Sequence, residues 1–267
     1  MEGWPAEANG SMFENVFLYS SIVIGLFLLS IPIVVRTAYR FSASCKGTRL
    51  SVNQLPAEAA ELIAWRMPPL EALGFHIAGC YDFGQLTMET RTIVATFTHG
   101  QTQELANVWL SVSTGKTCSY LEFSTQTPNG ILLETNSNGI LPLAPENEEI
   151  RVFRFPEISG VAELHRVHRQ IVAKYSGGPW IGDAPQGVAI ERVTRIIEGY
   201  APRLCKLGYL RLAENGKSYR LTWKGAFRVT LNGTWPVSAV RRFIARYEMR
   251  NELRSLEVHG LARLQKA

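Results

Sequence analysis

The chain has 267 residues and a formal net charge of +5, and no internal repeat or low-complexity tract runs through it. Its four cysteines are scattered, with no CxxC pair and no histidine placed nearby at zinc-binding spacing. This pattern excludes a disulfide framework and a cysteine-based zinc site. We therefore expect four free thiols, at Cys45, Cys80, Cys118 and Cys205.

An uncharged apolar run follows an N-terminal tail of residues 1–14. It reads NVFLYSSIVIGLFLLSIPIVV from Asn15 to Val35, and as a helix it would cover about 30 Å, the thickness of the bilayer hydrocarbon. The run predicts a transmembrane helix that contacts the bilayer through residues 15–35. The alternative is a buried core helix, but core helices are usually shorter and carry a polar face.

The charges beside this run predict its orientation. Three glutamates and no lysine or arginine precede it, whereas four basic residues follow closely, namely Arg36, Arg40, Lys46 and Arg49. The positive-inside rule then places the C-terminal part in the cytoplasm. We predict a single-pass protein of the inner cell membrane with its N-terminus outside.

After a juxtamembrane linker at residues 36–55, the pattern predicts an α+β domain at residues 56–175. Apolar and polar residues alternate in successive segments that turn signals separate, which indicates an antiparallel meander. Helices on either side of the meander in sequence would cover its apolar face. The expected strands are 76–83, 92–98, 107–113, 119–123, 131–135 and an edge strand at 150–155, and the helices are 56–73 and 161–175.

A Gly/Pro-rich linker at residues 176–187 precedes a small basic domain at residues 188–267. We expect this domain to be mainly helical with one hairpin. The expected elements are helices 188–207 and 237–256 and a hairpin that pairs 208–212 with 218–222.

Motifs of known catalytic or nucleotide-binding sites are missing from the sequence. His165 and His168 would share one face of a helix, which suits either a metal or ordinary helix packing. Asp82 and Glu122 would form a carboxylate pair only if they met across the sheet; otherwise alternation predicts that both face solvent. We favour the structural reading in each case and predict no catalytic residue, metal site or cofactor.

Charge is distributed unevenly along the chain. Residues 189–267 contain sixteen Lys and Arg against six Glu, a net of +10, and the remainder nets −5. This asymmetry predicts an acidic partner, which would be nucleic acid, anionic lipid or an acidic protein face. The predicted binding residues are Arg242, Arg246, Arg250, Arg254, Lys217 and Arg220.

Four of these arginines recur every four residues along the last predicted helix and form a slanting stripe. A partly separate apolar stripe of Val240, Phe243, Ile244 and Tyr247 is expected to pack inward. The alternative for the arginine stripe is an ordinary solvated helix face.

One local resemblance adds to this reading. Residues 207–226, LGYLRLAENGKSYRLTWKGA, resemble the wing of a winged-helix domain with its Y-x-L-T-x-K-G phrase. The resemblance implies nucleic-acid binding, although a winged helix has three helices before its wing and only one is evident here. The overall layout is similar to that of uncharacterised bacterial single-pass membrane proteins, a likeness that carries no activity.

The leading functional hypothesis is a membrane-anchored cytosolic adaptor or scaffold without catalytic activity. The alternative is a membrane-tethered nucleic-acid-binding protein with a winged-helix-like C-terminal domain. The third is an enzyme whose catalytic groups come from distant parts of the chain.

Overall fold

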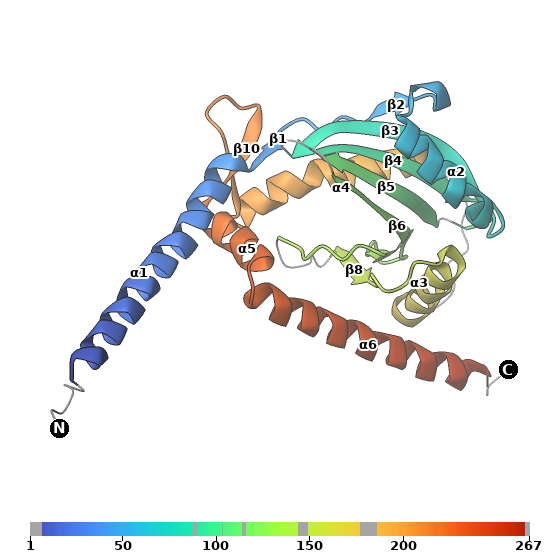
Figure 1. The fold of residues 1–267 in the computed structure, drawn as a ribbon. Coiled ribbons are helices and arrows are strands. Elements are labelled where there is room, and N and C mark those ends of the chain that lie inside the picture. Colours follow the sequence, from blue (N-terminus) through green and yellow to red (C-terminus); the bar gives the residue numbers. More distant parts are fainter. Residues whose placement is uncertain are drawn as a thin grey trace.

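Figure 1 shows a twisted sheet with helices on both of its faces and a long helix at each end of the chain. This computed structural model describes residues 7–87, 90–102, 104–113, 116–143, 149–176 and 186–264. The strands run in the order β8-β7-β6-β5-β4-β3-β1-β10-β9, and β2 pairs with β3 beside this path. The predicted α+β class is confirmed.

The centre of the sheet is the predicted antiparallel meander. Successive side chains of a strand point to opposite faces, so the alternating sequence gives each strand two different sides. The strands are β3 (Phe75–Thr87), β4 (Thr90–His99), β5 (Leu105–Ser113), β6 (Lys116–Gln126) and β7 (Leu132–Asn136). The strand β8 (Ile150–Arg154) then pairs with β7 in parallel, so the sheet is mixed and not purely antiparallel.

Two helices cover one face of the meander, as predicted. They are α2 (Ala57–Glu71) and α3 (Val161–Tyr175). Leu70 of α2 and Leu164 of α3 lie in the same buried cluster as Phe123 of β6. This cluster is the main core of the protein.

A third helix, α4 (Gln186–Lys206), packs on the opposite face of the sheet. Its Val193 and Ile197 share a buried cluster with Val94 and Trp109 of the meander. Most of the linker predicted before this helix, residues 176–187, lies outside the described residues.

Strands from the two ends of the chain complete the sheet. The predicted hairpin is confirmed as β9 (Leu210–Leu212) and β10 (Ser218–Leu221). Its strand β10 pairs with β1 (Arg40–Ser42), which in turn meets β3. The chain then continues through β2 (Thr48–Leu50) and the short 3₁₀ helix η1 (Val52–Gln54).

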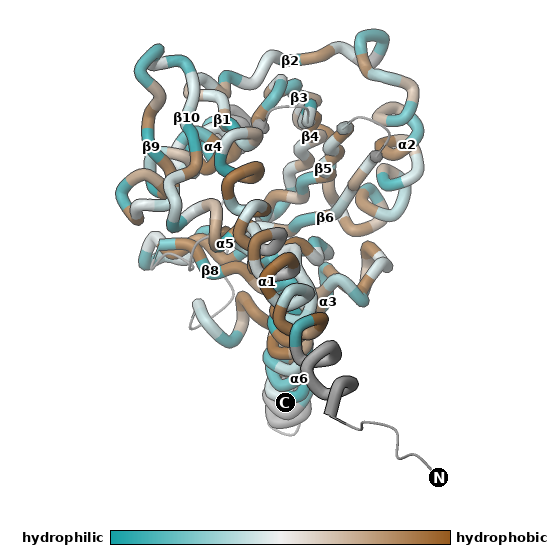
Figure 2. Tube along the Cα trace, turned by 60° about the vertical axis from the view of Figure 1, so that its left-hand side comes forward, coloured by the Kyte–Doolittle hydropathy of each residue, from teal (hydrophilic) through white to brown (hydrophobic). Residues whose placement is uncertain are grey.

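The predicted transmembrane segment, residues 15–35, lies within α1 (Glu7–Ala38). Brown turns mark the apolar residues of α1 in Figure 2. The end of this helix contacts the folded part of the chain: Val35 packs on the cluster that contains Leu221, and the Arg36 guanidinium lies 4.4 Å from the centroid of the Trp223 ring.

Within the described ranges, no helix combines the length and the apolar character that crossing a membrane requires. The prediction of a transmembrane helix at residues 15–35 is therefore wrong. The single-pass inner-membrane location, with the N-terminus outside and the C-terminal part cytoplasmic, depended on that helix and is wrong as well. The physical difference is that the last turns of the apolar run pack against protein, on α5 and β10.

Two further helices end the fold. The helix α5 (Trp223–Gly233) begins after Thr222, whose hydroxyl oxygen accepts a hydrogen bond from the Gly225 N–H at 3.1 Å. The helix α6 (Val237–Leu264) runs past α5 and packs beside α3 (Figure 1). All four cysteines are free thiols, as predicted.

Candidate functional site

One side of α6 is fixed to the body of the protein. Met249 and Leu256 are buried in the main core, together with residues of α3. The Lys174 ammonium of α3 donates hydrogen bonds of 2.7 Å to Glu252 and 2.8 Å to the Ser255 hydroxyl. The second half of α6 is therefore held both by apolar packing and by a charged hydrogen bond.

The opposite side of α6 is apolar but exposed. Phe243 is 70% and Tyr247 60% exposed, and Val240 and Ile244 are also largely open to solvent. Because each helical residue turns by about 100°, these four side chains centre about 180° away from Met249 and Leu256. The prediction that this stripe packs inward is wrong, because the inward side is formed by residues further along the helix.

The predicted arginine stripe borders this open apolar side. Arg246, Arg250 and Arg254 are exposed and follow one edge of it. Arg246 lies 3.9 Å from the Glu157 carboxylate, and a pair so exposed contributes little. Arg250 and Arg254 form no ion pair with any described residue. We call the four apolar residues and these three arginines the α6 surface; its members are Val240, Phe243, Ile244, Tyr247, Arg246, Arg250 and Arg254.

A groove of about 660 Å³ lies between α6 and the edge strand β8. Its walls are residues 138–142, residues 152–156 and the side of α6 from Arg241 to Glu252. Arg241 and Arg242 give the groove positive charge, and burial, followed by the nearby charge of Arg228, lowers the pKa of Arg241. The Ile244 side chain lines the groove and also belongs to the α6 surface. The two features are therefore continuous.

The remaining predicted binding residues lie elsewhere. Lys217 and Arg220 belong to the hairpin, which lies at the far end of the sheet from β8. The predicted set is thus divided between two surfaces. Arg40 and Arg211, which the prediction omitted, stand beside Arg220 on neighbouring strands. The predicted pairing of 208–212 with 218–222 would place Arg211 opposite Tyr219, so the observed pairing of Arg211 with Arg220 differs from it by one residue.

The two histidines of α3 take part in core packing. His168 is fully buried, and its ring nitrogens lie 2.8 Å from the Thr125 hydroxyl and 2.9 Å from the Thr135 hydroxyl. Burial lowers the pKa of His168 to about 3. No group of three or more potential metal ligands occurs in the part of the chain that the structure describes.

His165, which lies close to His168 and also packs on Phe123, forms part of a charged cluster. Its Nε2 lies 3.0 Å from the Glu104 carboxylate, which also accepts a 2.6 Å hydrogen bond from Arg169. Burial alone would raise the pKa of Glu104, but the hydrogen bonds from His165 and Arg169 and the nearby positive charge lower it to about 2. The Glu104 carboxylate is thus ionised and bonded through both of its oxygens, which indicates a structural role.

Asp82 and Glu122 do not meet. Asp82 on β3 accepts hydrogen bonds from Arg91 at 2.7 and 2.9 Å. Glu122 lies three strands away on β6 and is buried on the face of the sheet that α4 covers. There it accepts hydrogen bonds from the Asn107 amide and the Trp109 indole N–H. Burial, only partly offset by these hydrogen bonds, raises the pKa of Glu122. The expectation that Glu122 faces solvent is therefore wrong.

Comparison with known proteins finds no matching family, no matching curated protein and no matching solved structure.

Proposed function

We propose that the protein is a non-catalytic adaptor that binds an acidic partner protein through the α6 surface. The observation that carries this proposal is the open apolar side of α6, opposite its buried side and bordered by Arg246, Arg250 and Arg254. Aromatic residues and arginine are the side chains that contribute most to binding at protein interfaces. Phe243 and Tyr247 supply the aromatic part.

The partner's chemistry follows from the charges along this surface. Arginines spaced four residues apart repel one another, and carboxylates on a partner would relieve that repulsion. A second copy of the chain would instead bring two arginine stripes together. Charge complementarity therefore favours an acidic segment that carries its own apolar residues, such as an amphipathic helix.

The interior supports a non-catalytic role. The groups best suited to acid–base chemistry are His165, His168 and Glu104. His165 and Glu104 are bonded to each other, and His168 is bonded to two threonine hydroxyls in the core. A general acid or base needs access to a substrate proton. His168 has none, because it is fully buried.

Binding to defined probes tests the proposal. The first probe is a labelled helical peptide of about twenty residues with leucine and phenylalanine along one face and glutamate beside it. The second is the same peptide with lysine in place of glutamate, and the third is a single-stranded oligonucleotide. We expect the full-length protein to bind the acidic peptide and to bind the basic peptide at least tenfold more weakly.

Variants place the binding on α6. Phe243→Ala with Tyr247→Ala should weaken binding of the acidic peptide at all salt concentrations, because the apolar contact is lost. Arg246→Gln with Arg250→Gln should weaken it mainly at low ionic strength, where charges are least screened. Arg195→Gln, at an exposed arginine of α4, is the matched control and should change nothing.

Two results would overturn the proposal. One is equal binding of the acidic and basic peptides, which would show that charge does not select the partner. The other is tight binding of the oligonucleotide, lost in the arginine variants, with no binding of the acidic peptide. That second pattern would favour the nucleic-acid-binding alternative.

A further inference from the structure

Three arginines stand side by side across the strands at the hairpin end of the sheet. Arg220 of β10 is paired with Arg40 of β1 on one side and with Arg211 of β9 on the other. Neighbouring strands lie about 4.8 Å apart, and directly paired residues point to the same face of the sheet. We call Arg40, Arg220 and Arg211 the arginine ladder.

The ladder lacks internal compensation. All three arginines are exposed, and none forms an ion pair with a described residue. Like charges directly opposite one another destabilise a sheet. A bound anion would remove this repulsion, so the arrangement points to a ligand that carries several negative charges close together.

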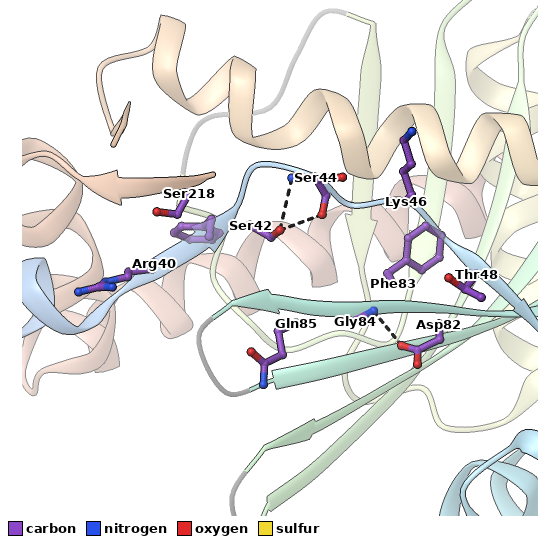
Figure 3. A pocket seen from close by; sticks show the side chains of 11 residues that line it. Arg40, Ser42, Ser44, Lys46, Thr48, Asp82, Phe83, Gly84, Gln85 and Ser218 are labelled. Atoms are coloured by element: carbon purple, nitrogen blue, oxygen red, sulfur yellow. Dashed lines mark hydrogen bonds between the residues drawn. The ribbon is translucent and has the colours of Figure 1, made fainter. Parts of the chain in front are cut away.

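A pocket of about 580 Å³ adjoins the ladder, and Arg40 lies at one end of it. Figure 3 shows Ser42 and Ser44 on one side of the pocket and Gly84 and Gln85 of β3 on the other. The pocket exists because β1 and β2 both pair with β3, whereas residues 43–47 between them arch away from it. Its volume lies within the range of small-molecule sites.

The lining of the pocket is polar and lacks a free acid. Ser42 and Ser218 are paired across β1 and β10, on the same face as the ladder. The only carboxylate among the described lining residues is Asp82, and both its oxygens are bonded, Oδ1 to the Gly84 N–H at 2.8 Å and Oδ2 to Arg91. Lys46 and Arg40 are the basic residues of the lining, and Arg40 connects the pocket to the rest of the ladder.

We propose that the arginine ladder and this pocket together bind a small phosphorylated molecule with at least two phosphate groups. The guanidinium groups would donate paired hydrogen bonds to the phosphate oxygens. The serine hydroxyls would bond the remainder of the ligand in the pocket. A polar pocket of this size beside a row of only three arginines suits a compact ligand better than an extended nucleic-acid strand, which needs a longer groove.

Inorganic tripolyphosphate and adenosine triphosphate are suitable probes, and calorimetry on the full-length protein measures their binding. We expect saturable binding of both. Arg220→Gln removes the central arginine and should weaken the binding of both probes about tenfold or more. Ser218→Ala should weaken only the binding of adenosine triphosphate, whose non-phosphate part would reach the pocket.

Two controls separate this site from a general effect of positive charge. Arg195→Gln removes an exposed arginine elsewhere and should leave the binding of both probes unchanged. A single-stranded oligonucleotide of ten nucleotides tests the other source of phosphate. The site does not use the α6 surface, so failure here leaves the adaptor proposal standing.

Three outcomes would overturn the inference. The first is an absence of tripolyphosphate binding at low ionic strength. The second is binding that Arg220→Gln leaves unchanged while the circular dichroism spectrum confirms that the variant is folded. The third is oligonucleotide binding that depends on Arg220 without any binding of the two small probes, which would make the ladder a nucleic-acid contact.

Discussion

Met249 and Phe243 lie on different sides of α6, and their environments differ sharply. Met249 is 6% exposed and belongs to the main core, whereas Phe243 is 70% exposed. The two residues are six positions apart, so their side chains point about 120° apart around the helix axis. The helix therefore has two apolar sides, one that fixes it to α3 and one that is open.

This difference predicts unequal effects of truncation. Met249→Ala should lower the free energy of unfolding by about 2–4 kcal/mol, because it leaves a cavity in the core. Phe243→Ala should change it by less than about 0.5 kcal/mol, because the side chain is solvated. Urea unfolding of the two variants measures both values. A large loss in the Phe243 variant with none in the Met249 variant would show that α6 packs by its other side.

The sequence predicted the meander well and the sides of α6 badly, for different physical reasons. In a strand, alternation such as Ile93, Ala95 and Phe97 identifies a continuous apolar face, which here is buried. It did not reveal that α4 also buries the other face, where Val94 lies. In α6 the strongest local apolar stripe is the exposed one, and the buried Met249 and Leu256 are too widely spaced to stand out. A periodic pattern identifies an apolar helix face but does not show whether that face packs against the rest of the protein or stays exposed.

A second prediction concerns acid. The pKa of buried His168 is lowered to about 3, so below pH 6.5 the unfolded chain binds a proton there that the folded chain does not. Stability conferred by the neutral ring is therefore complete above pH 6.5 and is lost as the pH falls toward 3. The loss amounts to about 1 kcal/mol per pH unit for one proton.

His168→Gln tests this effect, because glutamine can bond Thr125 and Thr135 but does not titrate. Between pH 6.5 and 4.5, the free energy of unfolding should fall less steeply in the variant than in the native protein. Glu104, whose pKa is about 2, contributes in the same direction only below about pH 4.5 and does not interfere in this range. Burial also lowers the pKa of His99, so the free energy of unfolding of both proteins keeps some dependence on pH in this range. Equal slopes would contradict the assignment.

A third prediction concerns the glycine of the hairpin's Y-x-L-T-x-K-G phrase. At Gly225 the backbone carbonyl of Tyr209 occupies the place that a Cβ would take, and the Leu221 side chain lies 2.8 Å from that place. Gly225→Ala should therefore destabilise the protein by about 3 kcal/mol or more, because the start of α5 must move away from the hairpin. Thermal unfolding measures the loss.

Gly199 is the matched control. It also lies in a helix, α4, but nothing lies within 4 Å of a Cβ added there. Gly199→Ala should be neutral or stabilise the protein by up to about 1 kcal/mol, because alanine favours helix more than glycine does. A comparable loss in both variants would indicate a general sensitivity of the helices and not the close approach at Gly225.

The candidate sites were only partly predictable. The periodic arginines of α6 were evident because four residues are close to one helical turn. The neighbouring positions of Arg40 and Arg220 were not, since they are 180 residues apart in sequence and no local pattern records which distant strands pair. The apolar run at residues 15–35 shows the same limit, because composition alone does not reveal that its end packs against α5 and β10.

The last prediction concerns the cost of the arginine ladder. Without a bound anion, Arg220 repels Arg40 and Arg211 on both sides, so Arg220→Gln should raise the free energy of unfolding by a few tenths of a kcal/mol to about 1 kcal/mol at low ionic strength. The gain should shrink between 10 mM and 1 M sodium chloride, because the screening length falls from about 30 Å to about 3 Å. If Arg220→Gln lowers stability at every salt concentration, then Arg220 is bonded within the protein and its repulsion does not dominate.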